Sequence, residues 1–369
     1  MPGPDTTRQK SKGLSQFAVT NYAIALLVAL LAQPATGRGE SSPPRHPQSA
    51  SSAAPVATPQ DSTEKSSNTS PQESSPQPPG QNPSPNNGTF VIRKTVDEVV
   101  LRATVVDDRQ RMVTDLDKGA FTVYEDGKPQ TIVSFHHEDI PVAMGILIDN
   151  SGSMREKRAK VNAAALNLVR SSNPQDEVFV VNFNDEYYLD QDFTNDLLKL
   201  KEALEKIDAK GGTALYEALV ASAENFKNTK LERKVLFVVT DGEDNASRET
   251  LEQAVKQLQQ ENGPSVYAIG LLGEEEHPKR AKRALEIIAQ RTGGLAFFPK
   301  TLDEVDEISK QVAHDIRNQY TIGYKPTTPK EAGGFRSIRV EAKAKGHGKM
   351  TVRTKSGYYA GADVATRSK

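Results

Sequence analysis

The chain has 369 residues, with 47 lysine and arginine residues against 48 aspartate and glutamate residues, and it contains no cysteine and no tryptophan. The formal net charge of −1 provides no overall positive field of the kind that nucleic-acid binding needs. The absence of cysteine excludes thiol catalysis, disulfide bonds and zinc–thiolate sites. Hydrophobic residues make up only 36% of the chain, so we expect part of it to stay unfolded and the rest to hold the core.

Residues 1–37 are typical of an export signal. Positive charges at 8–12 precede an uncharged apolar run at 23–32, and small residues follow it up to Gly37. A run of about ten residues is too short to cross a bilayer, because a helix rises about 1.5 Å per residue and the hydrocarbon core is about 30 Å thick. The sequence therefore predicts a cleaved signal and an exported protein in the periplasm, the cell envelope or the medium. A retained membrane anchor is the alternative.

Residues 38–88 form a Ser/Pro-rich segment of a different composition. They hold 11 of the 22 prolines and contain no Leu, Ile, Phe or Tyr. Such a segment cannot bury enough apolar area to offset about 1–2 kcal/mol of backbone entropy per residue. We expect a disordered, extended spacer, which serves either as a stalk through the envelope or as a passive linker.

Residues 89–140 are predicted to be a β segment. A β-branched run at 99–106 indicates a strand, and a hairpin is expected between 121 and 135. The Asp126-Gly127 pair at the tip of this hairpin suits the positive φ angles of a tight turn.

Residues 319–362 are predicted to be a second β segment, before a short tail at 363–369. Neither β segment is large enough for a secure core of its own. We therefore expect their strands, about seven together, to form one small all-β module beside the domain that separates them. Such an insertion is feasible because the termini of a domain often lie close together.

Residues 141–318 alternate apolar strands with amphipathic helices. The run at 142–148 is continuously apolar, as in strands that are buried on both faces. A helix from about residue 156 follows it, with apolar side chains at helical spacing. Further strands are expected at 178–183, 235–239, 266–270 and 296–298. This repetition predicts an α/β domain with a doubly wound, mostly parallel sheet that is covered by helices on both faces.

Three polar loops of this domain carry its candidate functional residues. The first apolar strand ends in Asp149-x-Ser151-x-Ser153, the strand at 235–239 ends in Thr240-Asp241-Gly242, and a Gly-Gly-Thr loop ending at Thr213 enters a helix. In open α/β sheets, ligands bind at the carboxyl ends of the strands where the strand order reverses, so we expect these loops to meet there.

The loops offer two carboxylates and three hydroxyls, which are hard oxygen donors. They suit a hard divalent cation such as Mg²⁺. Gly152, Gly211 and Gly212 are expected to let the backbone approach the ion without a Cβ clash. Each loop alone has an ordinary alternative, because serine and threonine cap helices and Thr-Asp-Gly is a common turn. The three loops together, in this order, are far more specific.

This pattern resembles the metal-ion-dependent adhesion site of the von Willebrand factor type A domain. The resemblance implies a doubly wound sheet of about six strands, a Mg²⁺ or Mn²⁺ ion, and a partner protein whose carboxylate completes the coordination. It also implies that Ser151, Ser153 and Thr213 are direct or near-direct ligands, and that Asp149 and Asp241 bind directly or through water.

The resemblance covers residues 141–318. The flanking segments at 121–130 and 319–324 resemble exported bacterial proteins of the acidobacterial type A-related group. Taken together, the residues predict an exported, non-enzymatic protein-binding or adhesion module that uses the metal to bind an acidic group of a partner protein. No nucleic-acid partner is expected, and a membrane is involved only if the N-terminal segment stays uncleaved.

Two other functions remain open. One is an envelope scaffold that binds through other surfaces, with the metal structural or absent. The other is a metal-dependent hydrolase, which needs a general base or nucleophile beside the metal. Asp185, Glu186 and Asp244 could approach the site, although no catalytic residue is assigned. We expect substitution of Asp149 or Asp241 to weaken metal binding without loss of the fold, because the loops are expected at the surface.

The remaining polar residues favour structural roles. Adjacent residues on a strand point to opposite faces, so His136 and His137 are expected at a hairpin edge and not at a shared metal. Tyr187 and Tyr188 follow a strand near the metal edge, where they are expected either to pack a loop or to contact a partner. The acidic run at 274–276 is expected to be a solvated loop.

Overall fold

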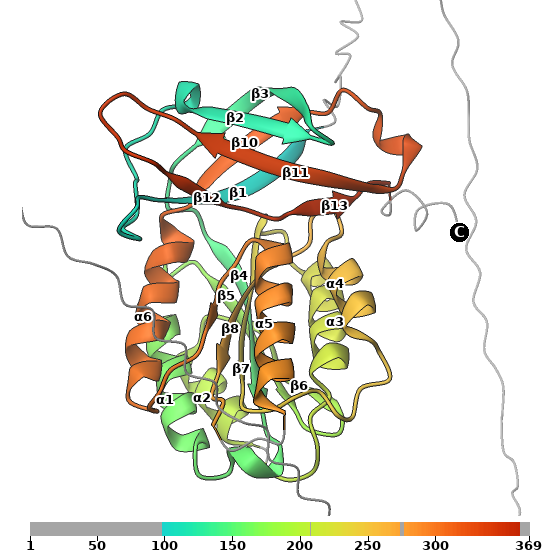
Figure 1. Ribbon diagram of the computed structural model, residues 1–369. Helices are drawn as coiled ribbons and strands as arrows, with labels where there is room; N and C mark the ends of the chain where they lie inside the picture. Colours follow the sequence, from blue (N-terminus) through green and yellow to red (C-terminus); the bar gives the residue numbers. More distant parts are fainter. Residues whose placement is uncertain (1–97, 207, 274–276, 362–369) are drawn as a thin grey trace, which may run out of the picture. The chain divides into compact units, whose positions relative to one another are not determined.

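The computed structural model describes residues 98–206, 208–273 and 277–361, which form a six-stranded sheet with helices and a seven-stranded sheet (Figure 1). The predicted signal, spacer, C-terminal tail and acidic run at 274–276 lie outside the described residues. Within the described residues, no helix combines the length and the apolar character that a membrane span requires.

The six-stranded sheet is mixed. Its strands, in spatial order, are β6 (Tyr187–Thr194), β5 (Glu177–Phe183), β4 (Val142–Asp149), β7 (Arg233–Thr240), β8 (Ser265–Gly270) and β9 (Ala296–Phe297). All neighbours are parallel except β6, which is antiparallel to β5. The chain passes from β4 to β5 on one side and reaches β7 on the other, so the strand order reverses beside β4.

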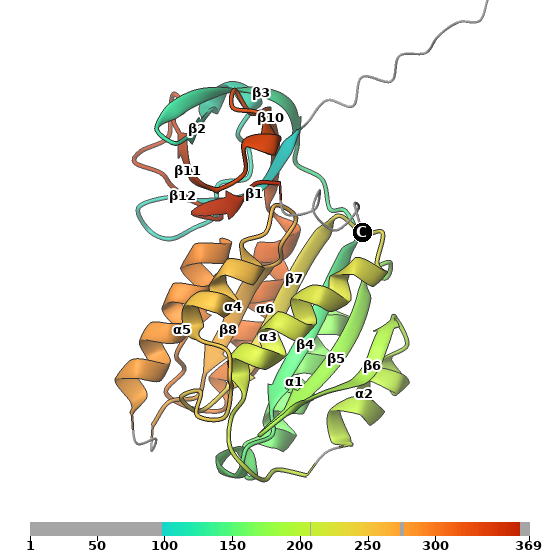
Figure 2. The same cartoon turned by 90° about the vertical axis from the view of Figure 1, so that its right-hand side faces the viewer.

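Helices cover both faces of this sheet, as Figure 2 shows. One face carries α1 (Arg158–Arg170), α2 (Leu197–Glu205) and α6 (Glu304–Arg317), and the other carries α3 (Leu215–Asn225), α4 (Leu251–Leu258) and α5 (Pro278–Thr292). Alternate residues of β4 enter the two cores: Ile146 packs with the first set of helices and Leu147 with the second. This two-sided burial explains why the strand is continuously apolar.

The described part also contains short 3₁₀ helices, namely η1 (Lys118–Ala120), η2 (Gly152–Met154), η3 (Phe226–Asn228) and η4 (Lys330–Ala332). Because η2 follows the end of β4, α1 begins at Arg158, slightly later than the sequence predicted. Strand β6 was not predicted. It lies at the edge of the sheet and lacks the apolar run that marks the buried strands.

The seven-stranded sheet combines the two flanking segments. In spatial order it consists of β12 (Thr351–Arg353), β1 (Val99–Val106), β10 (Tyr320–Lys325), β3 (Lys128–His136), β2 (Phe121–Glu125), β11 (Phe335–Ala342) and β13 (Gly357–Tyr359). Its strand pairs are antiparallel. Strand β1 lies between β12 and β10, and β3 lies between β10 and β2, so strands from the two segments alternate in part of the sheet. The flanking all-β module predicted from the sequence is therefore present.

The hairpin between β2 and β3 turns at Asp126 and Gly127, whose φ angles are +48° and +76°. Both values are positive, as the predicted tight turn requires. At the other end of β3, His136 is exposed, whereas the ring of His137 stacks on Tyr320 at a centroid distance of 4.4 Å. The two histidines do not share a site.

A buried polar network crosses the seven-stranded sheet. Arg336 lies 3.3 Å from Glu125 Oε1, and both side chains are only 2% exposed. The hydroxyls of Tyr324 and Tyr358 both donate to Glu125 Oε2, the latter over 3.0 Å. Burial raises the pKa of Tyr358 to about 12, so this hydroxyl stays protonated at neutral pH.

Candidate metal site

The loop after β4 folds back onto the aspartate that ends the strand. The Ser151 backbone N–H donates to Asp149 Oδ1 over 2.7 Å. The hydroxyl oxygens of Ser151 and Ser153 lie 3.1 Å apart, because Ser151 is the N-cap of η2 and Ser153 lies within this tight turn. One carboxylate and two hydroxyls are thus gathered on a single loop.

The neighbouring strand β7 brings a second carboxylate to the same place. β4 and β7 are paired in parallel, so their carboxyl ends lie side by side. The Ser153 hydroxyl donates to Asp241 Oδ1 over 2.8 Å, and the Thr240 hydroxyl donates to Asp149 Oδ2 over 2.6 Å. These two bonds cross between the strand ends and fix the orientations of both carboxylates.

Thr213 enters from the loop before α3. Its backbone N–H donates to Asn245 Oδ1 over 2.8 Å, and its carbonyl accepts from the Asn245 N–H over 3.0 Å. A Cβ atom placed on Gly242 would lie 3.6 Å from Thr213 Oγ1, so this hydroxyl lies beside the turn that carries Asp241. The structure therefore brings together all five residues that the sequence singled out.

The burial of the site differs from what the sequence led us to expect. Asp149 and Asp241 are fully buried, so the prediction of a surface position was wrong for the two aspartates, whereas Gly152 and Ser153 of the loop after β4 are exposed. The reason is that both residues belong to strand ends, which the loops and helices around them cover. Burial raises the pKa of Asp149 to about 6; hydrogen bonds from Thr240 and Ser151 oppose this shift, and the charge of Asp241 adds to it.

Lys157 is a member of the site that the sequence analysis missed. Its ammonium nitrogen lies 2.6 Å from Asp241 Oδ2, and its side chain is 26% exposed. The spacing offered a signal, because Lys157 follows Ser153 by four residues and directly precedes α1. The ammonium group shows that positive charge is stabilised beside this carboxylate.

The donor set fits a hard divalent cation. Two carboxylates and three hydroxyls converge, and Mg²⁺ is commonly held by one or two carboxylates while it keeps several water molecules. Across the described ranges, no group of three or more His, Asp or Glu side chains is arranged to hold a metal, so the hydroxyls and water would supply the remaining ligands. Beside Asp241, the positively charged Lys157 ammonium takes the place of a metal cation.

The two glycines before Thr213 have a different role from the one predicted. Gly211 has a φ of +77°, and a Cβ atom there would collide with the carboxylate of Asp185. Asp185 Oδ1 accepts from the Gly212 N–H over 2.7 Å. The glycines thus make room for a carboxylate that holds the loop.

Asp244 has a comparable positioning role. Its Oδ2 accepts from the Tyr216 N–H over 2.8 Å and from the Ser247 hydroxyl over 2.7 Å. Asp185 and Asp244, which were considered for hydrolysis, therefore both hold loops around α3. The third candidate, Glu186, is exposed.

A comparison of the sequence with family models identifies the domain that carries this site. Residues 144–243 match the model of the von Willebrand factor type A domain. The matched segment includes most of β4, the whole of β7 and all three loops. The α/β domain is a von Willebrand factor type A domain. The resemblance of the flanking segments to the acidobacterial group stays a prediction.

Solved structures resemble the type A domain at low sequence identity. The von Willebrand factor type A structure from Catenulispora acidiphila is 14% identical, with a TM-score of 0.43, and the match covers 73% of this chain and 74% of that one. The vWF domain of the type V pili tip protein Mfa5 from Porphyromonas gingivalis is 13% identical, with a TM-score of 0.40 and coverages of 48% and 97%. The PilB minor pilin from Streptococcus sanguinis is 13% identical, with a TM-score of 0.41, and the match spans 49% of this chain and 62% of the pilin, less than two thirds of its length. No curated protein matches the sequence.

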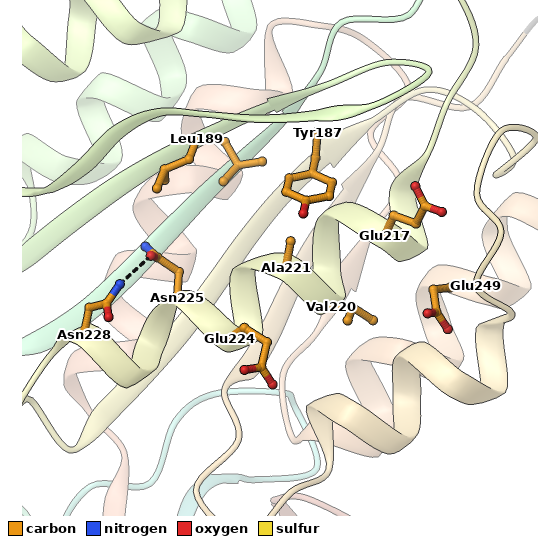
Figure 3. Close-up of a pocket in the computed structure, with 10 residues that line it drawn as sticks. Tyr187, Leu189, Glu217, Val220, Ala221, Glu224, Asn225, Asn228 and Glu249 are labelled. Carbon is orange, nitrogen blue, oxygen red and sulfur yellow. Dashed lines mark hydrogen bonds between the residues drawn. The ribbon is translucent and has the colours of Figure 1, made fainter. Parts of the chain in front are cut away.

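A groove of about 550 Å³ lies between α3 and the edge strand β6 of the type A domain (Figure 3). Tyr187 and Leu189 form its wall on the strand side, and Val220 and Ala221 lie on the α3 side. Its carboxylates are Glu217, Glu224 and Glu249.

The groove begins at the metal edge of the sheet. Tyr187 pairs with Phe183, and Phe183 pairs with Asp149, so these three residues lie on one line across the strand ends. Tyr187 and Tyr188 are strand residues that are 47% and 39% exposed, and the interpretation that they pack a loop was wrong.

Proposed function

We propose that this protein is an exported, non-enzymatic binding protein whose type A domain holds Mg²⁺ or Mn²⁺ and binds an acidic group of a partner protein. The ligands in this proposal are Asp149, Ser151, Ser153, Thr213 and Asp241. One observation carries it: two fully buried carboxylates converge at neighbouring strand ends, together with hydroxyls. Burying like charges is unfavourable unless a cation compensates them.

The charge balance favours an anionic partner group. Two ionised aspartates offset the charge of a divalent ion, and the hydroxyl ligands are neutral. The occupied site therefore attracts one more anionic oxygen, and a partner's Glu or Asp side chain is the simplest source in a protein complex.

The surroundings of the site suit a protein partner. Exposed apolar side chains lie at the start of β6, at Tyr187, Tyr188 and Leu189, beside the strand ends that carry the site. Groups of exposed apolar residues of this kind mark interaction surfaces. A partner that engages the metal could extend along the groove from the metal edge.

Metal binding is tested by calorimetric titration of Mg²⁺ and Mn²⁺. Asp149→Asn and Asp241→Asn keep the shape of each side chain and remove one ligand charge. We expect each to weaken binding by at least about 100-fold, since losing a ligand costs more than the 10–100-fold typical of outer-shell changes. Asp303→Asn changes an exposed aspartate and serves as the control. Unchanged metal affinity in Asp149→Asn would contradict the site.

Partner recognition is tested by capture from an envelope extract in Mg²⁺ and in EDTA. We expect a captured protein to be lost in EDTA and with Asp149→Asn, and kept with Asp303→Asn. The ion pair of Lys157 with Asp241 favours a second candidate function, a scaffold that needs no metal. A partner that binds equally well in EDTA would support that scaffold.

Export is tested on the mature protein. Mass spectrometry of its N-terminus is expected to show cleavage near residue 37. A cytoplasmic product that retains Met1 would contradict export, and a full-length membrane-bound product would support the retained anchor.

A further inference from the structure

A second polar pocket lies at the opposite end of β7 from the metal loops. Its volume is about 320 Å³. Residues from β1, from the start of β7, from the turn before β8 and from the segment after β12 line it. It therefore lies where the seven-stranded sheet meets the type A domain. Four of its lining residues are cationic: Arg102, Lys230, Lys234 and Lys355.

The carboxylates of this pocket do not balance that charge. Glu261 and Glu232 are the acidic residues among those that line it. Glu261 also forms an ion pair with Lys330, which brings a fifth cation to the same place. Glu232 lies 3.9 Å from Arg102, but its side chain is 81% exposed, so solvent screens its charge. An excess of positive charge remains.

Two of the cations are held in place by the fold. The Lys355 ammonium donates to the Glu261 carbonyl over 2.6 Å, and Arg102 Nη1 donates to Thr321 Oγ1 over 2.5 Å. Burial lowers the pKa of Lys355 to about 8; Glu261 opposes this shift, and the charges of Arg102 and Lys234 add to it. The protonated lysine is thus destabilised by burial and by its cationic neighbours, and a bound anion would oppose both effects.

We propose that this pocket binds a phosphate group. A guanidinium offers paired N–H donors that match phosphate oxygens, and ammonium groups add charge without demanding a fixed geometry. The volume leaves room for part of an organic group attached to the phosphate. The ligand would contact Arg102 of the seven-stranded sheet and Lys234 of the six-stranded sheet. Because it binds only the folded chain, it would stabilise the junction between the two sheets.

The full chain is titrated with inorganic phosphate at pH 7, below the pKa of Lys355, with sodium chloride at equal ionic strength as the reference. We expect one calorimetric binding site and a higher unfolding midpoint in phosphate than in chloride. Lys355→Met is expected to weaken binding by about tenfold or more, as the loss of a charge-assisted hydrogen bond implies. Lys349→Met makes the same charge change at an exposed residue of the loop before β12 and should bind as the wild type does.

Arg102→Lys keeps the positive charge but removes the paired N–H donors of the guanidinium. The variant therefore shows whether binding depends on the geometry of hydrogen bonds to the phosphate or only on electrostatic attraction. We expect weaker binding in this variant as well. If circular dichroism shows that Lys355→Met is unfolded, Lys230→Met at the exposed rim replaces it. Flotation with vesicles that contain phosphatidic acid, against phosphatidylcholine alone, shows whether a lipid headgroup can supply the phosphate. No effect of phosphate beyond chloride, or equal binding by Lys355→Met and Lys349→Met, would overturn the proposal.

Discussion

Both sheets contain buried carboxylates, but the hydrogen-bond donors and cations around these carboxylates differ. In the seven-stranded sheet, Glu125 accepts from two tyrosine hydroxyls and pairs with Arg336, which is as deeply buried as the glutamate itself. In the type A domain, Asp149 and Asp241 lie at strand ends and receive hydroxyl and backbone donors. The one cation that contacts Asp241 among the described residues is Lys157, whose side chain is partly exposed.

This difference separates a structural cluster from the proposed binding site. Glu125 faces a cation that is rigidly built into a sheet, so its charge is compensated within the fold. At the aspartates, Asp241 pairs with a lysine that is able to withdraw toward solvent, because part of its side chain already lies there. We therefore expect changes at Glu125 and Arg336 to act on stability, and changes around the aspartates to act on ion binding.

The largest effect is expected for Arg336→Ala. This substitution leaves Glu125 buried without its cation, and breaking a buried ion pair in this way typically costs about 3–5 kcal/mol. Urea unfolding of the full chain measures the loss, with Lys343→Ala as a control at an exposed ion pair of the same sheet. If both variants unfold at the same urea concentration, the view that Glu125 depends on its internal cation is wrong.

An intermediate effect is expected for Thr240→Val. Valine keeps the shape of threonine but removes the hydroxyl that donates to Asp149. A lost hydrogen bond to a buried group costs about 1–3 kcal/mol of stability, and outer-shell changes of this kind lower metal affinity by about 10–100-fold. Urea unfolding and metal titration measure the two effects, with Thr131→Val at an exposed strand position as the reference. A drop in stability without any change in Mg²⁺ affinity would make Asp149 a structural residue like Glu125.

The smallest effect is expected for Lys157→Met. Whether this substitution strengthens or weakens Mg²⁺ binding is the informative result. The ammonium and a divalent ion compete for Asp241, so removing the ammonium should tighten Mg²⁺ binding by about tenfold, which corresponds to about 1.4 kcal/mol. Calorimetry compares this variant with Lys160→Met, which removes a more exposed lysine of α1 that pairs with Asp303. Weaker Mg²⁺ binding in Lys157→Met would mean that the lysine supports the ion and does not compete with it.

The local sequence determined much of what the structure contains. Continuous apolar runs marked β4 and β7 because both faces of these strands are buried. Asp126-Gly127 marked its turn because the two positive φ angles are intrinsic to that turn type. Two of the three loops were identifiable because their oxygen donors follow strands whose carboxyl ends meet at one edge, and the third because Thr213 follows two glycines at the entrance to a helix.

Only the tertiary structure decided which of these groups touch and how deeply they are buried. Lys157 reaches Asp241 across 84 positions of sequence, and Arg336 reaches Glu125 across 211. Strand β6 gave no periodic signal because its exposure follows from its place at the sheet edge. Burial and charge compensation depend on such long-range neighbours, and the pattern of residues along the chain does not contain them.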